Sequence, residues 1–232
     1  MITLWELGGR GARRYSLFSW RTRMALAHKG LGFETQPVRM SDKAAIAFSS
    51  GKTVPVIRDG NREGEAVVVR DSWKIAEHLE DRYPGAPALF GGAIGRGVSQ
   101  AFNVWVDRAV VPAMLPVIVA DIHERVDPAD DEFFRQMMEK IVRTTLEETR
   151  AGRDEALRRL GKAVEPMQAA LKRQAYVCGA QPAYADYILF SVFQWARVMS
   201  PQEVLGPEDP LCAWRERILD LFGGFARDVP LA

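Results

Sequence analysis

The hydrophobic pattern of the first third of the chain changes period repeatedly, which predicts strands alternating with helices. Residues 2–7 form a short apolar run that ends at two glycines and is typical of a buried strand. From Ser19 onward, apolar residues recur at helical spacing as far as Leu31. The glycines on either side of Leu31 then mark the end of the predicted helix.

The next apolar runs predict three more strands and two more helices. In chain order they are the strand 33–38, a short helix at 41–48, the strands 53–57 and 66–70 joined by the hairpin loop 58–65, and the helix 73–83. A strand–helix–strand unit followed by a hairpin and a helix is the arrangement of a thioredoxin-like domain. In that arrangement the crossover helix allows a parallel pair, and the hairpin adds antiparallel strands.

The remainder of the chain has a helical period throughout. A stretch rich in Gly, Pro and Ala at 86–97 predicts a linker. The helices expected after it are 97–115, bent or ended near Pro112 and Pro116, then 131–159, 163–174, 184–198 and 211–222. The predicted fold is an α/β thioredoxin-like domain at 1–85, the linker 86–97 and an all-α domain at 98–232.

Composition and charge narrow the function classes. Of 232 residues, 47% are hydrophobic and 26% charged, and the net charge of +1 gives no electrostatic case for binding nucleic acid or an anionic membrane. The apolar stretch 104–120 contains charged residues and prolines, so we do not interpret it as a membrane span. Two cysteines fit a reduced, cytoplasmic setting without a metal cluster, and leave a single bridge open.

The first chemical candidate is the pair Ser16 and Ser19, at the junction of the first loop and the first helix. Free backbone N–H groups and the helix dipole favour an anion there. A serine hydroxyl at this place can donate a hydrogen bond to a thiolate and lower the pKa of the thiol. The simpler interpretation is that one of the serines only caps the helix.

A second candidate is Val54–Pro55, which lies in a predicted strand. Proline has no N–H group and cannot donate a hydrogen bond to a neighbouring strand. A cis bond here would leave the Val54 backbone free to pair with an extended peptide. The simpler interpretation is a trans proline at a sheet edge.

The third candidate is Asp71–Ser72, where Ser72 can cap the next helix and Asp71 can bind an ammonium group. A plain capping pair is the simpler interpretation.

The order and spacing of these segments resemble the glutathione transferase superfamily. The similarity is carried by 16–26, by Gly51–Ile57 with its Val-Pro pair, and by Asp71–Leu79. The start of the predicted buried helix, with Asp186, continues it into the second half. Within the superfamily, the Trp-Arg-Thr-Arg and Asp-Ser-Trp-Lys segments look most similar to bacterial β-etherases and the fungal etherase-like class.

This resemblance implies glutathione as co-substrate and a thiolate that attacks an electrophilic aromatic or β-aryl ether carbon. By position, Ser16 would donate to the glutathione sulfur, with Ser19 as the alternative. The implied tripeptide-binding residues are Lys52, Thr53, Val54, Pro55, Asp71 and Ser72. The residues that we expect around the apolar substrate are Tyr15, Trp105, His123 and Trp195, although core packing is the simpler interpretation for each.

Two residues depart from the family pattern. Leu17 stands where many members have proline, and Ala183 stands where a Ser or Thr cap usually precedes Asp186, so the capping box is half-built. The resemblance also implies a homodimer. Two alternatives stay open: a glutathione-transferase-like binding or scaffold protein without turnover, and a thioredoxin-type disulfide reductase, which the serines at 16 and 19 disfavour.

Overall fold

The computed structural model describes residues 1–60 and 66–232, so most of the predicted hairpin loop 58–65 lies outside the described residues. Four strands form one mixed sheet, in which β1 (Ile2–Leu7) pairs parallel with β2 (Phe33–Val38) and antiparallel with β3 (Val56–Gly60). The strand β4 (Ala66–Arg70) completes the order β2-β1-β3-β4. The predicted thioredoxin-like topology is confirmed.

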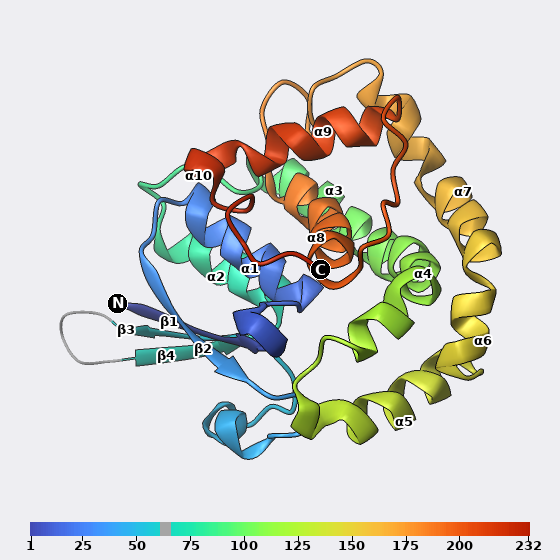
Figure 1. Ribbon diagram of the computed structural model, residues 1–232. Coiled ribbons are helices and arrows are strands. Elements are labelled where there is room, and N and C mark those ends of the chain that lie inside the picture. Colours follow the sequence, from blue (N-terminus) through green and yellow to red (C-terminus); the bar gives the residue numbers. More distant parts are fainter. Residues whose placement is uncertain (61–65) are drawn as a thin grey trace.

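Two helices and two short 3-10 segments, at Arg10–Ala12 and Ala44–Ser49, complete the described part of the first domain (Figure 1). The helix α1 (Leu17–His28) crosses over between the parallel strands, and α2 (Ser72–Arg82) follows β4. The predicted short helix at 41–48 is a 3-10 helix at Ala44–Ser49. The strand expected at 53–57 begins three residues late, at Val56, directly after the Val54–Pro55 pair.

The rest of the chain is helical, as predicted. The helices are α3 (Ala93–Trp105), α4 (Val111–His123), α5 (Asp131–Val142), α6 (Leu146–Ala151), α7 (Arg153–Leu171), α8 (Tyr184–Met199), α9 (Pro210–Leu219) and α10 (Leu221–Gly224). The helix expected at 131–159 is wrong as a single element, because Arg143 adopts a left-handed conformation and Gly152 leaves the helical geometry. The helix expected at 163–174 is the end of α7, which continues through Pro166.

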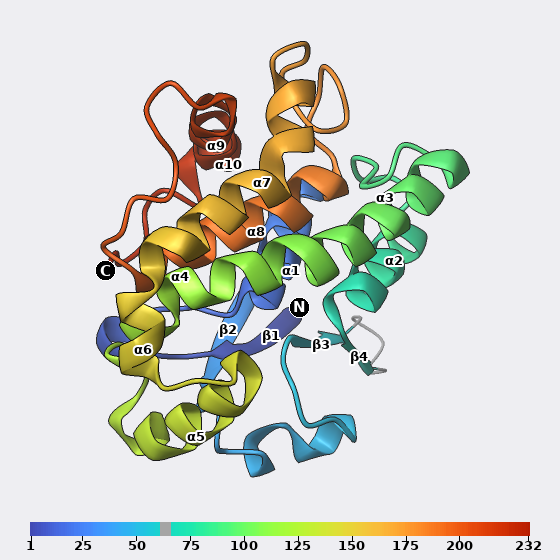
Figure 2. The same ribbon diagram turned by 90° about the vertical axis from the view of Figure 1, so that its right-hand side faces the viewer.

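The run from α3 to α4 is one long helix in Figure 2, with a π-helical turn at Val106–Val110. Pro112 and Pro116, near which the sequence predicts a bend or an end, do not end this run, and the wider turn just before Pro112 accommodates the missing N–H of that proline. This run of 31 residues is long and apolar enough to cross a membrane by length and composition alone. The core helix of a soluble protein can meet the same two criteria. Here α4 packs against α7 and α8, with Met114 and Ile118 buried.

The two halves of the molecule share a continuous core in which α1 packs against α8. At this seam the buried Arg21 of α1 donates to Ser191, to Asn103 at 2.8 Å and to Asp107 at 2.7 Å. Helix α3 begins at Ala93, inside the stretch predicted as linker, and packs so closely that a Cβ on Gly95 would stand 1.8 Å from the Phe90 carbonyl oxygen.

The start of α8 is built around Asp186, a buried carboxylate. Ala183 occupies the cap position and has no side-chain acceptor, while Asp186 accepts the Ala183 N–H at 3.1 Å, which confirms the half-built capping box. The same carboxylate accepts three further bonds, from the backbone of Val177 and Cys178 and from the Trp214 indole. These added donors replace the missing half of the box in fixing the helix start.

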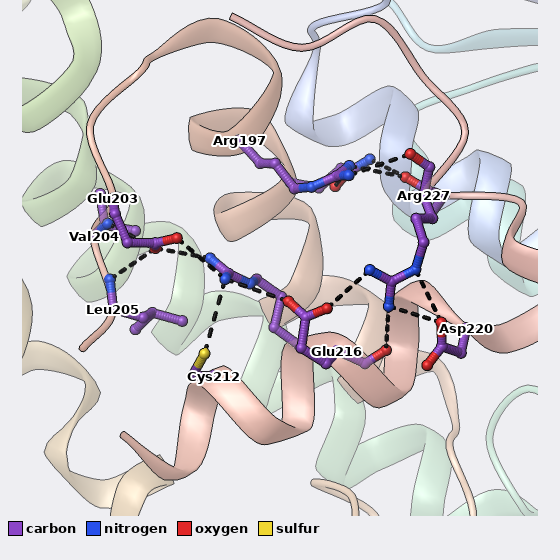
Figure 3. Close-up of polar contacts among 11 residues, drawn as sticks. Arg197, Glu203, Val204, Leu205, Cys212, Glu216, Asp220 and Arg227 are labelled. Atoms are coloured by element: carbon purple, nitrogen blue, oxygen red, sulfur yellow. Dashed lines mark hydrogen bonds and ion pairs between the residues drawn. The ribbon is translucent and has the colours of Figure 1, made fainter. Parts of the chain in front are cut away.

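The C-terminal segment is fastened to the helical domain by arginines (Figure 3). Arg197 of α8 donates to the carbonyl groups of Ala226 and Arg227. Arg227 pairs in turn with Glu216 of α9 and with Asp220. The segment therefore stays against α8 and α9.

Candidate functional site

A cavity of about 560 Å³ opens beside the N-terminus of α1, facing α5. One end is polar and is lined by residues that the sequence singled out: Ser16, Lys52, Thr53, Val54, Pro55, Asp71 and Ser72. The other end is mostly apolar and includes Phe18, Met40, Ile46, Met137 and Ile141. The size and the combination of apolar walls with a few convergent polar groups are typical of a small-molecule site.

Ser16 is the N-cap of α1 and lines the cavity. Its Oγ accepts the N–H of Ser19 at 3.3 Å, so the capping interpretation is correct, yet the hydroxyl proton of Ser16 is not used by that bond. Ser19 is 1% exposed, and its hydroxyl has no partner among the described residues. Of the two serines, only Ser16 can present a donor to a molecule in the cavity.

The Val54–Pro55 bond is cis, in agreement with the sequence hypothesis. The carbonyl oxygen of Pro55 accepts the N–H of Asp71 at 3.2 Å, which ties this turn to the start of α2. Over residues 1–60 and 66–232, no hydrogen bond involves the Val54 backbone. Its N–H and C=O are therefore available to an extended peptide in the cavity.

Asp71, not Ser72, caps α2, so this part of the prediction is wrong. Asp71 has φ of 76° and ψ of 128°, outside the helical region, and its Oδ1 accepts the N–H groups of Trp73 and Lys74. Ser72 is already the first helical residue and is buried, with its carbonyl oxygen bonded to the Tyr184 hydroxyl at 2.8 Å. Asp71 Oδ2 takes no bond within the part of the chain that the structure describes.

Lys52 and Thr53 are exposed at the mouth of the cavity. In the described part of the chain, Lys52 has no carboxylate within ion-pair distance, whereas Arg39 on the same cavity pairs with Asp42 at 3.9 Å. Among the described residues, the polar end thus offers the unpaired ammonium group of Lys52 and the carboxylate of Asp71 to a ligand that carries both signs of charge.

The four residues expected around an apolar substrate do not line this cavity, in the chain as described. Tyr15 is 2% exposed, and burial raises the pKa of its hydroxyl well above its usual value. His123 stacks on Phe134, and Trp105 packs on Phe102. Trp195 packs against the core. Core packing, the simpler interpretation for these side chains, is therefore correct: Tyr15 is buried just before α1, and the other three lie on helix faces that pack against their neighbours.

The apolar wall comes instead from two segments far apart in the chain. Met40 and Ile46 follow β2, while Met137 and Ile141 stand one helical turn apart on α5. Phe18, at the start of α1, also belongs to the apolar lining. The amphipathic pattern of α5 was the available signal, since Ile141 is 55% exposed on a helix with a clear apolar stripe.

Neither cysteine lines this cavity. Both are free. Cys178 is exposed, yet desolvation by its neighbours and the Asp186 carboxylate raise the pKa of its thiol to about 12. The Cys212 sulfur lies 3.9 Å from Arg215 Nη2 in the network of Figure 3. Within the described ranges, His, Cys, Asp and Glu side chains form no group of three or more that could hold a metal ion.

Comparison with known proteins finds two family matches: the glutathione S-transferase N-terminal domain over residues 15–82 and the C-terminal domain over 97–212. The glutathione transferase GSTFuA3 of Phanerochaete chrysosporium is 26% identical, with a TM-score of 0.77 over 97% of this chain and 92% of that one. A glutathione S-transferase of Ceriporiopsis subvermispora, crystallised with glutathione, is 22% identical, with a TM-score of 0.81 over 100% and 99%.

The β-etherase LigF of Sphingobium sp. strain SYK-6 is 21% identical, with a TM-score of 0.70 over 98% of both chains. Among curated proteins, glutathione S-transferase Z2 of Arabidopsis thaliana is 38% identical over 74 residues, 30% of this chain and 31% of that protein. A glutathione S-transferase-like protein of Aspergillus flavus is 26% identical over 66% of this chain and 55% of that one. These matched segments span 31% and 55% of the two curated relatives.

Proposed function

Because the chain belongs to the glutathione S-transferase family, we propose that it is an enzyme that joins glutathione to an apolar electrophile. The observation that carries the proposal is the cavity itself, which holds the Ser16 hydroxyl, the free Val54 backbone and an apolar chamber in one space. A tripeptide thiol at the polar end would place its sulfur between Ser16 and the apolar wall.

In this proposal, each charged or polar part of glutathione would have a partner in the cavity. The backbone of Val54, before Pro55, would pair with the cysteinyl unit by strand addition. Asp71 and Ser72 would hold the γ-glutamyl head: Asp71 Oδ2 takes the ammonium group, and the N-terminus of α2 takes the carboxylate. Lys52, beside Thr53, would meet the glycine carboxylate.

Ser16 would activate the sulfur by donating its O–H to the thiolate. A free thiol has a pKa near 8.5, and a hydrogen bond to the charged form lowers it. The thiol proton leaves to solvent, and the thiolate attacks the electrophilic carbon. A carbon–sulfur bond forms, while the bond to the leaving group breaks and its electron pair departs with that group.

The substrate class that we propose is an aromatic or β-aryl ether-type electrophile. In the ether case the leaving group is an aryl oxide, which takes a proton from solvent. The support is the apolar wall of Phe18, Met40, Met137 and Ile141, together with the resemblance of the fold to a protein named as a β-etherase. A detoxifying role in the cytoplasm is part of the same proposal.

Two measurements on the purified protein test the function. Calorimetry with glutathione should detect binding at or below millimolar concentration. Turnover should then be measured with a single-ring chloronitroaromatic and with a β-aryl ether, following loss of substrate and appearance of the glutathione adduct. Binding without turnover of any electrophile would favour the alternative of a non-catalytic binding or scaffold protein. No binding of glutathione would refute both.

We also propose a homodimer that uses the outer face of α3. Ile94 is 86% exposed and Val98 65% exposed on this helix, and Val104 is also exposed. Ile94 and Val98 stand one helical turn apart, so they form an apolar patch that a second copy could cover. Light scattering should give twice the 26.0 kDa chain mass, and Val98→Glu should shift the protein toward the single-chain mass.

A further inference from the structure

The apolar chamber has two walls that belong to different halves of the molecule. One wall is the segment 39–46 after β2, which contributes Met40, Lys43 and Ile46. The other is α5, which contributes Met137 and Ile141. Figures 1 and 2 both show the segment after β2 beside the beginning of α5. The separation of these walls decides the width of the chamber.

A single carboxylate joins the two walls at their base. Asp130 is 0% exposed, and its Oδ2 accepts the N–H of Met40 at 2.7 Å. Its Oδ1 accepts the N–H of Ser41 at 2.9 Å and the Ser41 hydroxyl as well. These bonds span 90 residues of sequence, and three donors to one buried carboxylate make a specific, charge-assisted contact.

The position of Asp130 shows that this contact is not an ordinary helix cap. Asp130 is the N-cap residue of α5, where an aspartate normally accepts an N–H from its own helix. Its side chain makes no such bond, and both oxygens point to the segment after β2. A second contact on the same side is the Lys43 ammonium group, 5.6 Å from the centre of the Phe133 ring of α5.

From this geometry we infer that Asp130 is a specificity-determining residue that fixes the width of the electrophile chamber by fastening Met40 and Ser41 to the start of α5. The inference rests on the proposed function, because it concerns the second substrate of that same cavity. Asp130 does not line the cavity in the described chain and touches no substrate, so it acts as a positioning residue. Its expected effect falls on large electrophiles that contact both walls.

The test compares Asp130→Asn with the wild-type chain, using a single-ring and a two-ring chloroaromatic as electrophiles. For Asp130→Asn we expect kcat/KM with the two-ring substrate to fall about tenfold, because contact with one wall is lost. The single-ring substrate and the KM for glutathione should change by less than about twofold. Amide hydrogen exchange at Met40 and Ser41 should accelerate in the same variant.

Asp127→Asn is the matched control, because Asp127 lies three residues away and, among the described residues, its side chain accepts only the N–H of Ala129 in its own turn. It should leave both substrate selectivity and the exchange of Met40 unchanged. If Asp130→Asn fails to fold, Ser41→Ala tests the inference in its place. This variant removes one hydrogen-bond donor to Asp130 and should shift substrate selectivity in the same direction by a few-fold.

Unchanged selectivity in the variant that folds would overturn the inference, as would an equal loss with both electrophiles. Retained protection of the Met40 and Ser41 amides in Asp130→Asn would overturn it as well. If the wild-type protein transfers glutathione to neither electrophile, the proposed function fails instead. Amide exchange then still shows whether Asp130 fastens the segment.

Discussion

Replacing Ser16 by alanine removes the one hydroxyl that can donate to a glutathione sulfur from the N-terminus of α1. A hydrogen bond to a charged group contributes roughly 1.5–3 kcal/mol, and about 1.4 kcal/mol corresponds to one pKa unit. The pKa of the bound thiol should therefore rise by about one to two units. The free N–H groups and the dipole of α1 remain, so the loss is partial.

The sign of the pH dependence follows from this rise. At a pH below both thiol pKa values, Ser16→Ala should lower the thiolate fraction and kcat/KM by about 10–100-fold. Above the pKa of the variant, both proteins hold thiolate and the difference should shrink. The assay is kcat/KM for a chloronitroaromatic across pH, together with the ultraviolet absorbance of the bound thiolate.

Three comparisons separate activation from loss of the helix cap. Ser16→Ala also removes the bond to the Ser19 N–H, which should cost about 1 kcal/mol of stability. Ser16→Thr keeps both the hydroxyl and the cap and should retain most activity. Ser19→Ala should leave the thiol pKa unchanged, because Ser19 is buried away from the cavity. A normal thiol pKa in Ser16→Ala, or a raised one in Ser19→Ala, would refute the reasoning.

Three further predictions concern other parts of the molecule. Ala183→Ser should complete the capping box with Asp186 and raise the unfolding free energy by about 1 kcal/mol in urea titrations, and an unchanged value would show that the site tolerates no cap. Burial lowers the pKa of His28 from 6.5, so its contribution to stability should be present above pH 6.5 and lost as the pH falls toward its folded pKa. In His28→Gln this acid-dependent loss should diminish in urea titrations at several pH values, and an identical pH profile would contradict the assignment. Cys178 is exposed, yet it should react with iodoacetamide more slowly than an unfolded control at pH 8, because desolvation and the Asp186 carboxylate raise the pKa of its thiol to about 12. Rapid labelling that mass spectrometry maps to Cys178 in the folded protein would contradict this.

The polar half of the site was predictable because its residues lie in short segments whose chemistry is local. A serine before a helix, a proline at the start of a strand and an acidic residue before a second helix each carry their own signal. Ser16, Val54 and Asp71 all reach the cavity. The choice between Ser16 and Ser19 depended on which helix face is buried, and only the structure shows that.

The apolar half was not predictable by the same reasoning. Met40 and Met137 are unremarkable in sequence, and they share a chamber only because the chain returns α5 to the segment after β2. Large aromatic residues such as Trp105 and Trp195 were predicted to surround the substrate because they are hydrophobic. The same hydrophobicity favours packing between helices, which is where both side chains lie. The helix break at Arg143 has no signal in the sequence, because arginine does not favour the left-handed backbone conformation.

The close approach of Gly95 to the Phe90 carbonyl, and the buried Arg21 that joins α1 to the long helix, have a consequence for folding. A fragment that ends before α3 would leave that guanidinium group without its Asn103 and Asp107 acceptors and would expose the apolar face that α8 covers. The excised halves should therefore associate or aggregate when expressed alone. In the intact chain, calorimetry should record one cooperative melting transition. A replacement of Gly95 by a larger residue that separates the two halves should split this transition into two.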